Sequence, residues 1–237
     1  MIAPDAYCRE LEAYLCRKND GHLIRVTGPA FEQVCGWARQ GVPLTVAMTG
    51  IDRYVERYYR KGPRRRPVRI EFCEADVLEA FDDWRRATGV PLIARAPAGP
   101  ETGEAEVRRK GEPLATHVER VLARLTAGRT SQSDPRLRDA LEAASRALDA
   151  VQAEARGARG ERREGLLARL VAIDQALLEA ARGTLDEAAH AALAREADEE
   201  LAPFRGRMTA DAHAAARAAA IARLIRRKAG LPVVTFE

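Results

Sequence analysis

Basic side chains are crowded into one short stretch of this sequence. Between Arg53 and Arg69 there are eight arginines and lysines and a single acid, Glu56. Such side chains bind phosphate oxygens and add affinity for nucleic acid without reading its base sequence. Tyr58 and Tyr59 lie in the same stretch and could stack on a base if they are exposed. The stretch therefore predicts a set of phosphate-binding residues, namely Arg53, Arg57, Arg60, Lys61, Arg64, Arg65 and Arg66.

A dense acidic stretch follows directly and offers these cations a different partner. Residues 71–83 contain six acids and no base. The two stretches could pair within one chain, or with another protein or a second copy of this one. Exposed ion pairs contribute little stability, typically under about 1 kcal/mol each, so pairing and phosphate binding both remain open.

The arginine content of the whole chain carries little information about nucleic acid. The chain has 39 basic and 35 acidic residues and a net charge of +4, and its only lysines are Lys18, Lys61, Lys110 and Lys228. Together with abundant alanine, this bias towards arginine is typical of a GC-rich genome. Only the local clustering of charge is therefore informative.

The basic stretch begins inside the second of two predicted helices. The first helix starts at Pro29, because proline suits the first helical turn, and ends at Gly41, a typical C-cap residue. The second starts at Pro43 and continues to about Arg60, with apolar residues at helical spacing on one face.

The stretch from Val34 to Ile51, VCGWARQGVPLTVAMTGI, resembles the helix-turn-helix of DNA-binding proteins. The resemblance consists of a turn glycine, an apolar residue straight after it and apolar positions in the second helix. In that family the second helix enters the major groove, and residues near its N-terminus contact bases. The resemblance implies that four positions are exposed and that all but the aspartate contact bases or backbone: Thr45, Thr49, Asp52 and Arg53.

Two residues depart from this family pattern. Gly50 lies inside the second helix, where glycine weakens the helix by up to about 1 kcal/mol relative to alanine. Asp52 would repel phosphate if it pointed outward. A plain helical hairpin is the alternative interpretation.

Catalytic and metal chemistry find little support in the sequence. It contains no phosphate-binding glycine loop, nucleophile elbow or His-Glu-x-x-His motif. Glu187 and His190 have the spacing of metal ligands on a helix, but a di-iron bundle needs that motif twice. The cysteines form no close pair, so we expect buried thiols and no zinc site at Cys8, Cys16, Cys35 and Cys73. We therefore expect a non-enzymatic protein with no cofactor and no metal.

Composition divides the chain into two parts. Ten of the twelve aromatic residues and all four cysteines lie at or before Trp84. The predicted division is an N-terminal helical domain at residues 1–90, a linker rich in proline and glycine at 91–112, and a C-terminal antiparallel helical bundle at 113–237. Apolar residues at heptad spacing predict a coiled coil within that bundle. The expected fold class is all-α.

These patterns together predict a cytoplasmic nucleic-acid-binding protein. The helix-turn-helix resemblance favours DNA over RNA, and the bundle would mediate self-association or recruit a protein partner. The alternative is an adaptor or scaffold that binds proteins and does not contact nucleic acid. No stretch approaches the roughly 18 apolar residues of a membrane span, and acids lie in the first predicted helix, so neither a membrane span nor a signal peptide is expected.

Overall fold

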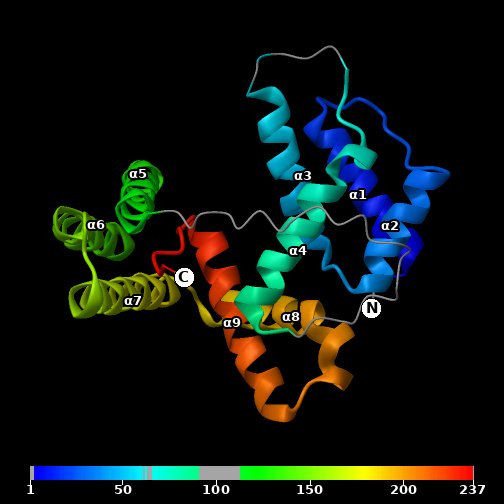
Figure 1. Cartoon of the computed structure of the whole chain (residues 1–237). Coiled ribbons are helices and arrows are strands. Elements are labelled where there is room, and N and C mark those ends of the chain that lie inside the picture. Colours follow the sequence, from blue (N-terminus) through cyan, green and yellow to red (C-terminus); the bar gives the residue numbers. More distant parts are fainter. Residues whose placement is uncertain (1–2, 61, 63–65, 91–112, 237) are drawn as a thin grey trace. The chain divides into compact units, whose positions relative to one another are not determined.

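The computed structural model describes residues 3–60, 62, 66–90 and 113–236, and Figure 1 shows its helices along the chain. Within these residues the chain forms α-helices and two short 3-10 helices and has no strand, which confirms the prediction of an all-α fold. None of the helices in this part of the chain is both long and apolar enough to cross a membrane. The elements are α1 (Pro4–Lys18), α2 (Pro29–Gln40), α3 (Leu44–Tyr59), η1 (Ile70–Cys73), α4 (Glu74–Thr88), α5 (Leu114–Ser131), α6 (Pro135–Ala155), α7 (Gly160–Gly183), α8 (Glu187–Leu201), η2 (Ala202–Arg207) and α9 (Ala210–Ala229).

The helices group into two compact units. Unit 1 contains Met1–Ala94 and Glu196–Ala220, and unit 2 contains Arg95–Arg195 and Ile221–Glu237. This grouping differs from the predicted division in one segment, because Glu196–Ala220 was expected in the C-terminal bundle and groups with the N-terminal helices instead. The predicted linker at residues 91–112 lies outside the described residues.

In unit 1, α2 and α3 are joined by the predicted glycine turn. Pro29 occupies the first turn of α2, and Gly41 ends the helix in the left-handed conformation with φ of 79°. The Gly41 N–H donates to the carbonyl of Ala38, and the next N–H, from Val42, donates to Trp37. Pro43 is the N-cap of α3. The boundaries of this helix pair therefore follow from local turn chemistry, as predicted.

Gly50 permits a close approach of α3 to α4. A Cβ atom at Gly50 would lie 2.4 Å from the Cα of Val77 and 2.8 Å from the carbonyl oxygen of Asp76. Only glycine can occupy such a contact without moving the backbone. The departure of Gly50 from the helix-turn-helix pattern thus has a structural cause, because this residue lies where the two helices touch.

Aromatic packing explains why the segment Glu196–Ala220 belongs to unit 1. Phe204 in η2 is 1% exposed, and its ring centroid lies 5.6 Å from that of Trp84 and 6.4 Å from that of Phe81. The two rings of α4 also stack on each other, with centroids 5.7 Å apart. Burial of an aromatic side chain contributes a large share of core stability, so α4 depends on a residue far away in the sequence.

A buried asparagine fixes the chain near the end of the basic stretch, at Val68. The Asn19 side chain donates to the carbonyl of Val68 at 3.0 Å and accepts the Val68 N–H at 2.6 Å. It also donates to the carbonyl of Leu15 in α1. Since both ends of the amide are satisfied, Asn19 holds the segment before η1 against the end of α1.

In unit 2, α5, α6 and α7 pack in sequence against one another. Asp134 caps α6 by accepting the N–H groups of Arg136 and Leu137, as its position before Pro135 predicts. The residues at heptad spacing are buried: Leu137, Leu141, Ala144, Leu148 and Val151 in α6, and Leu166, Leu170 and Leu177 in α7.

The C-terminal tail is anchored in unit 2 by a buried carboxylate. Asp174 in α7 accepts the backbone N–H of Val234 at 2.9 Å and pairs with Arg226 of α9. The Val234 carbonyl lies 3.0 Å from Nε2 of His117. Both backbone polar groups of Val234 therefore have a partner, and its side chain is fully buried.

Candidate nucleic-acid interface

Two of the predicted phosphate ligands pair with α4, the acidic helix, which contains most of the acids of residues 71–83. Arg57 donates two hydrogen bonds to Asp76, at 2.6 and 2.7 Å, and the Asp76 side chain is only 4% exposed. These bonds and the nearby negative charge raise the pKa of the Arg57 guanidinium above its ordinary value. Arg53 pairs with Asp83 at 2.8 Å. The alternative of pairing within one chain thus accounts for these two arginines, whose charges are largely neutralised by α4.

The predicted base-contacting residues at the start of α3 are also engaged. Thr45 donates to a carboxylate oxygen of Glu200 at 2.7 Å, and Thr49 donates to the carbonyl of Thr45 at 2.8 Å. Glu200 also accepts the indole N–H of Trp84 at 3.1 Å. The threonine hydroxyls therefore stabilise unit 1 internally.

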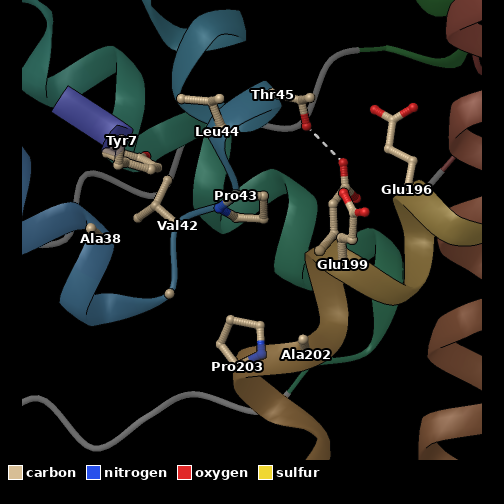
Figure 2. Close-up of a pocket in the computed structure, with 12 residues that line it drawn as sticks. Tyr7, Ala38, Val42, Pro43, Leu44, Thr45, Glu196, Glu199, Ala202 and Pro203 are labelled. Atoms are coloured by element: carbon tan, nitrogen blue, oxygen red, sulfur yellow. Dashed lines mark hydrogen bonds between the residues drawn. The ribbon is translucent and has the colours of Figure 1, made fainter. Parts of the chain in front are cut away.

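A cavity of about 600 Å³ lies beside this end of α3. Figure 2 shows Pro43, Leu44 and Thr45 on one side of it, with Glu196 and Glu199 of α8 on the other. In a helix-turn-helix this end of the second helix must meet the negatively charged major groove. Carboxylates next to the start of α3 disfavour that mode of binding.

Asp52 does not point towards solvent in the way that the resemblance implies. One of its carboxylate oxygens accepts the hydroxyl of Tyr14 at 2.6 Å, and the other lies 2.7 Å from Nζ of Lys18. Both partners come from α1. Asp52 therefore contributes to the packing of α1 on α3, and its charge is compensated.

Aromatic side chains form a row at the other end of α3. The Tyr54 ring lies 5.9 Å from that of Tyr58 and 6.4 Å from that of Phe72, with interplanar angles of only 20° and 15°. Tyr59 packs edge-on against Tyr58, with centroids 5.1 Å apart. Phe72 is 59% exposed, although it belongs to η1 next to the buried Cys73. The row therefore presents apolar ring surface to water.

Two arginines lie close to this row along the chain or through the backbone. Arg60 and Arg66 are exposed, and within the described residues neither pairs with a carboxylate. The carbonyl of Arg66 accepts a hydrogen bond from the Tyr58 hydroxyl at 3.2 Å, which connects this part of the basic stretch to the aromatic row. We call these six residues the aromatic–arginine surface: Tyr54, Tyr58, Tyr59, Phe72, Arg60 and Arg66. The remaining predicted ligands, Lys61, Arg64 and Arg65, lie outside the described residues.

Two tyrosines of this surface, Tyr54 and Tyr59, have a raised pKa. Burial raises the pKa of Tyr54 and that of Tyr59 above their ordinary value. In addition, the Arg57 guanidinium lies over the Tyr54 ring, 5.3 Å from its centroid. The Tyr54 and Tyr59 rings therefore carry no negative charge at neutral pH and do not repel an anionic ligand.

Sequence patterns indicated part of this surface and missed the rest. Tyr58 and Tyr59 were expected near the basic residues, and Tyr54 and Tyr58 are one helical turn apart, which was an available signal. Phe72 was not predicted, because it lies at the start of the acidic stretch 71–83, which contains no basic residue. A scan of protein-family models, a search of curated proteins and a search of solved structures find no match to this chain.

Proposed function

We propose that this protein binds nucleic acid through the aromatic–arginine surface of unit 1. The observation that carries the proposal is the row of three nearly parallel rings, with Phe72 exposed and Tyr54 and Tyr58 half-buried. Two arginines near this row, Arg60 and Arg66, have no carboxylate partner in the described residues. Rings of this kind stack on bases, and arginines at their edge bind the phosphates between those bases. The proposal moves the contact from the start of α3, where carboxylates gather, to the end of α3 and the segment that follows it.

Fluorescence anisotropy with labelled oligonucleotides at several salt concentrations tests the proposal. Phosphate contacts make log K fall linearly with log salt, by about 0.7 per contact on a single strand and about 0.9 on duplex DNA. Replacing both Arg60 and Arg66 by glutamine should therefore reduce the slope by about 1.4 to 1.8. Arg53→Gln is the matched control, because Arg53 lies on the same helix but is paired with Asp83, and it should change the slope much less.

Binding in the micromolar range or tighter with this change of slope supports the proposal. Absence of binding at low salt would refute it. An unchanged slope in the double variant would place the phosphate contacts elsewhere on the chain.

An adaptor function is the second candidate, and one feature of unit 2 favours it. A shallow apolar groove of about 320 Å³ runs between α6 and α7, lined by alanines together with Ile173 and Leu177. Small side chains let a partner helix approach closely, and a second copy of this chain is the partner we propose. Light scattering over a range of protein concentrations should then show a dimer, and Ala143→Arg, at an exposed position of the groove, should make it monomeric. A monomer at all concentrations would exclude self-association through this groove.

A further inference from the structure

The aromatic–arginine surface also indicates which form of nucleic acid is bound. We infer that it selects single-stranded nucleic acid over duplex, an inference that rests on the proposed function. In a duplex each base face is covered by its neighbours, so only the outer edges of bases and the backbone are open to a protein. Stacking on a protein side chain requires bases that are unstacked, as in a single strand.

The exposure of Phe72 is the first argument for stacking. A phenylalanine has no polar group that gains from water, yet this one is 59% exposed and its neighbour Cys73 is fully buried. Its ring is nearly parallel to that of Tyr54, and Tyr54 is nearly parallel to Tyr58. The three rings therefore have similar orientations, which suits successive bases of one strand.

The backbone around the row holds it in place. The Asn19 side chain makes two hydrogen bonds to the backbone of Val68. These bonds hold the segment before η1 and Phe72 against α1. Tyr58 and Tyr54 lie on α3, which Gly50 brings into direct contact with α4. The rings are thus fixed before the ligand arrives, which lowers the entropy lost on binding.

Binding of duplex DNA by a helix-turn-helix would require the start of α3 to enter the major groove, and this end of the helix is already occupied by internal contacts. Thr45 at the start of α3 bonds to Glu200, and Glu196 and Glu199 line the cavity beside it. Arg53 and Arg57, which face the acidic helix, are paired with Asp83 and Asp76. The start of α3 is therefore not available for a major groove.

The surface also lacks the amide side chains that recognise adenine by paired hydrogen bonds. Between Arg53 and Cys73 the sequence contains no asparagine or glutamine, the side chains that recognise adenine. Stacking accepts every base, because each has a π-face. We therefore expect weak dependence on base sequence.

The experiment compares a labelled twenty-nucleotide oligo-dT with a mixed-sequence duplex of equal length, using the full chain. The single strand should bind at least about tenfold more tightly at matched salt. Phe72→Leu keeps an apolar side chain but removes the ring, and should weaken single-strand binding by about 5- to 150-fold. Duplex binding and the salt slope of the remaining affinity should not change, because no phosphate contact is lost. An oligo-rU arm distinguishes RNA from DNA as the source of the strand.

Leu23→Ala is the matched control, since Leu23 is another exposed apolar residue of unit 1, at 81% exposure, and lies outside the row. It should leave binding unchanged. Phe72→Tyr keeps the ring and should retain most of the affinity, which separates loss of stacking from loss of fold.

The outcomes distinguish this inference from the proposed function. Equal or tighter binding of the duplex, or unchanged single-strand binding by Phe72→Leu, overturns the selection of single strands and leaves nucleic-acid binding standing. Failure of both oligonucleotides to bind at low salt overturns both proposals.

Discussion

Replacing Gly50 by alanine places a methyl group where the backbones of α3 and α4 meet. The new Cβ would lie 2.4 Å from the Cα and 2.6 Å from the amide nitrogen of Val77. Ordinary contacts at a Cβ exceed about 3.4 Å, so the overlap is about 1 Å. Because the neighbours are backbone atoms and cannot rotate away, the two helices must move apart.

The magnitude follows from two opposing effects. Alanine favours a helix by up to about 1 kcal/mol relative to glycine. Overpacking a close contact costs about 1–3 kcal/mol, and more where the surroundings cannot adjust. The neighbours of Gly50 are backbone atoms, so the cost of overpacking should lie at the upper end of this range. We therefore expect a net loss of about 2–3 kcal/mol in the stability of unit 1. A typical domain has a total stability of about 5–15 kcal/mol.

Tryptophan emission during urea unfolding measures this loss in unit 1 alone. The chain has two tryptophans, Trp37 and Trp84, which are 1% and 3% exposed, and both lie in unit 1. With a slope of about 1–3 kcal/mol per M urea, a loss of about 2–3 kcal/mol should lower the midpoint by about 0.7–3 M.

Gly36→Ala is the control, because Gly36 also lies within a helix of unit 1 but a Cβ there would meet only the end of the Gln40 side chain, at 4.0 Å. This change should raise stability by about 0.5–1 kcal/mol. If the two variants unfold at the same urea concentration, the result would contradict the close contact between α3 and α4 at Gly50.

Three further changes test the interior contacts. Arg57→Ala leaves the buried Asp76 carboxylate without its cation, and since Arg57 itself is 60% exposed we expect a loss of about 1–3 kcal/mol in the same urea assay, largely reversed when Asp76 is also changed to alanine. Burial raises the pKa of the Cys73 thiol to about 12, so iodoacetamide at pH 9 should label Cys73 slowly in the folded protein and rapidly in urea. The ordinary pKa of a thiol is lower, so the unfolded chain loses this proton first. The free energy of unfolding should therefore decline as the pH rises from about 9 to 12. Asp174→Ala removes the acceptor of the Val234 N–H, so amide exchange at Val234 should accelerate while the tryptophan transition of unit 1 stays unchanged. A double variant that is less stable than Arg57→Ala would contradict the argument for Arg57. Equally fast labelling of the thiol in the folded and unfolded states would contradict the argument for Cys73. A Val234 amide that stays protected from exchange in Asp174→Ala would contradict the argument for Asp174.

Local chemistry made much of the fold predictable. Pro29, Gly41 and Asp134 mark helix ends through effects that act within a few residues, and the structure places helix boundaries at all three. The heptad leucines of α6 and α7 reveal a buried face in the same way.

Contacts between distant residues could not be predicted from these patterns. Phe204 packs on Trp84 across more than a hundred residues, and nothing in the alanine-rich sequence around it indicates that partner. Whether Arg53 and Arg57 meet phosphate or carboxylate was left open for the same reason, because helical spacing shows that they share a face but not what lies opposite it. The exposure of Phe72 likewise depends on how η1 meets α3.

The discontinuity of unit 1 has a consequence for its synthesis. A ribosome makes the chain from the N-terminus, and domains generally fold as units while they emerge. The helices α1 to α4 emerge first, but Glu200 and Phe204, which bond to or pack on Trp84, follow only after the whole of Arg95–Arg195. During that interval the Trp84 face of α4 has no such cover, so the nascent chain exposes an aromatic patch that is a suitable target for a chaperone until the second segment arrives.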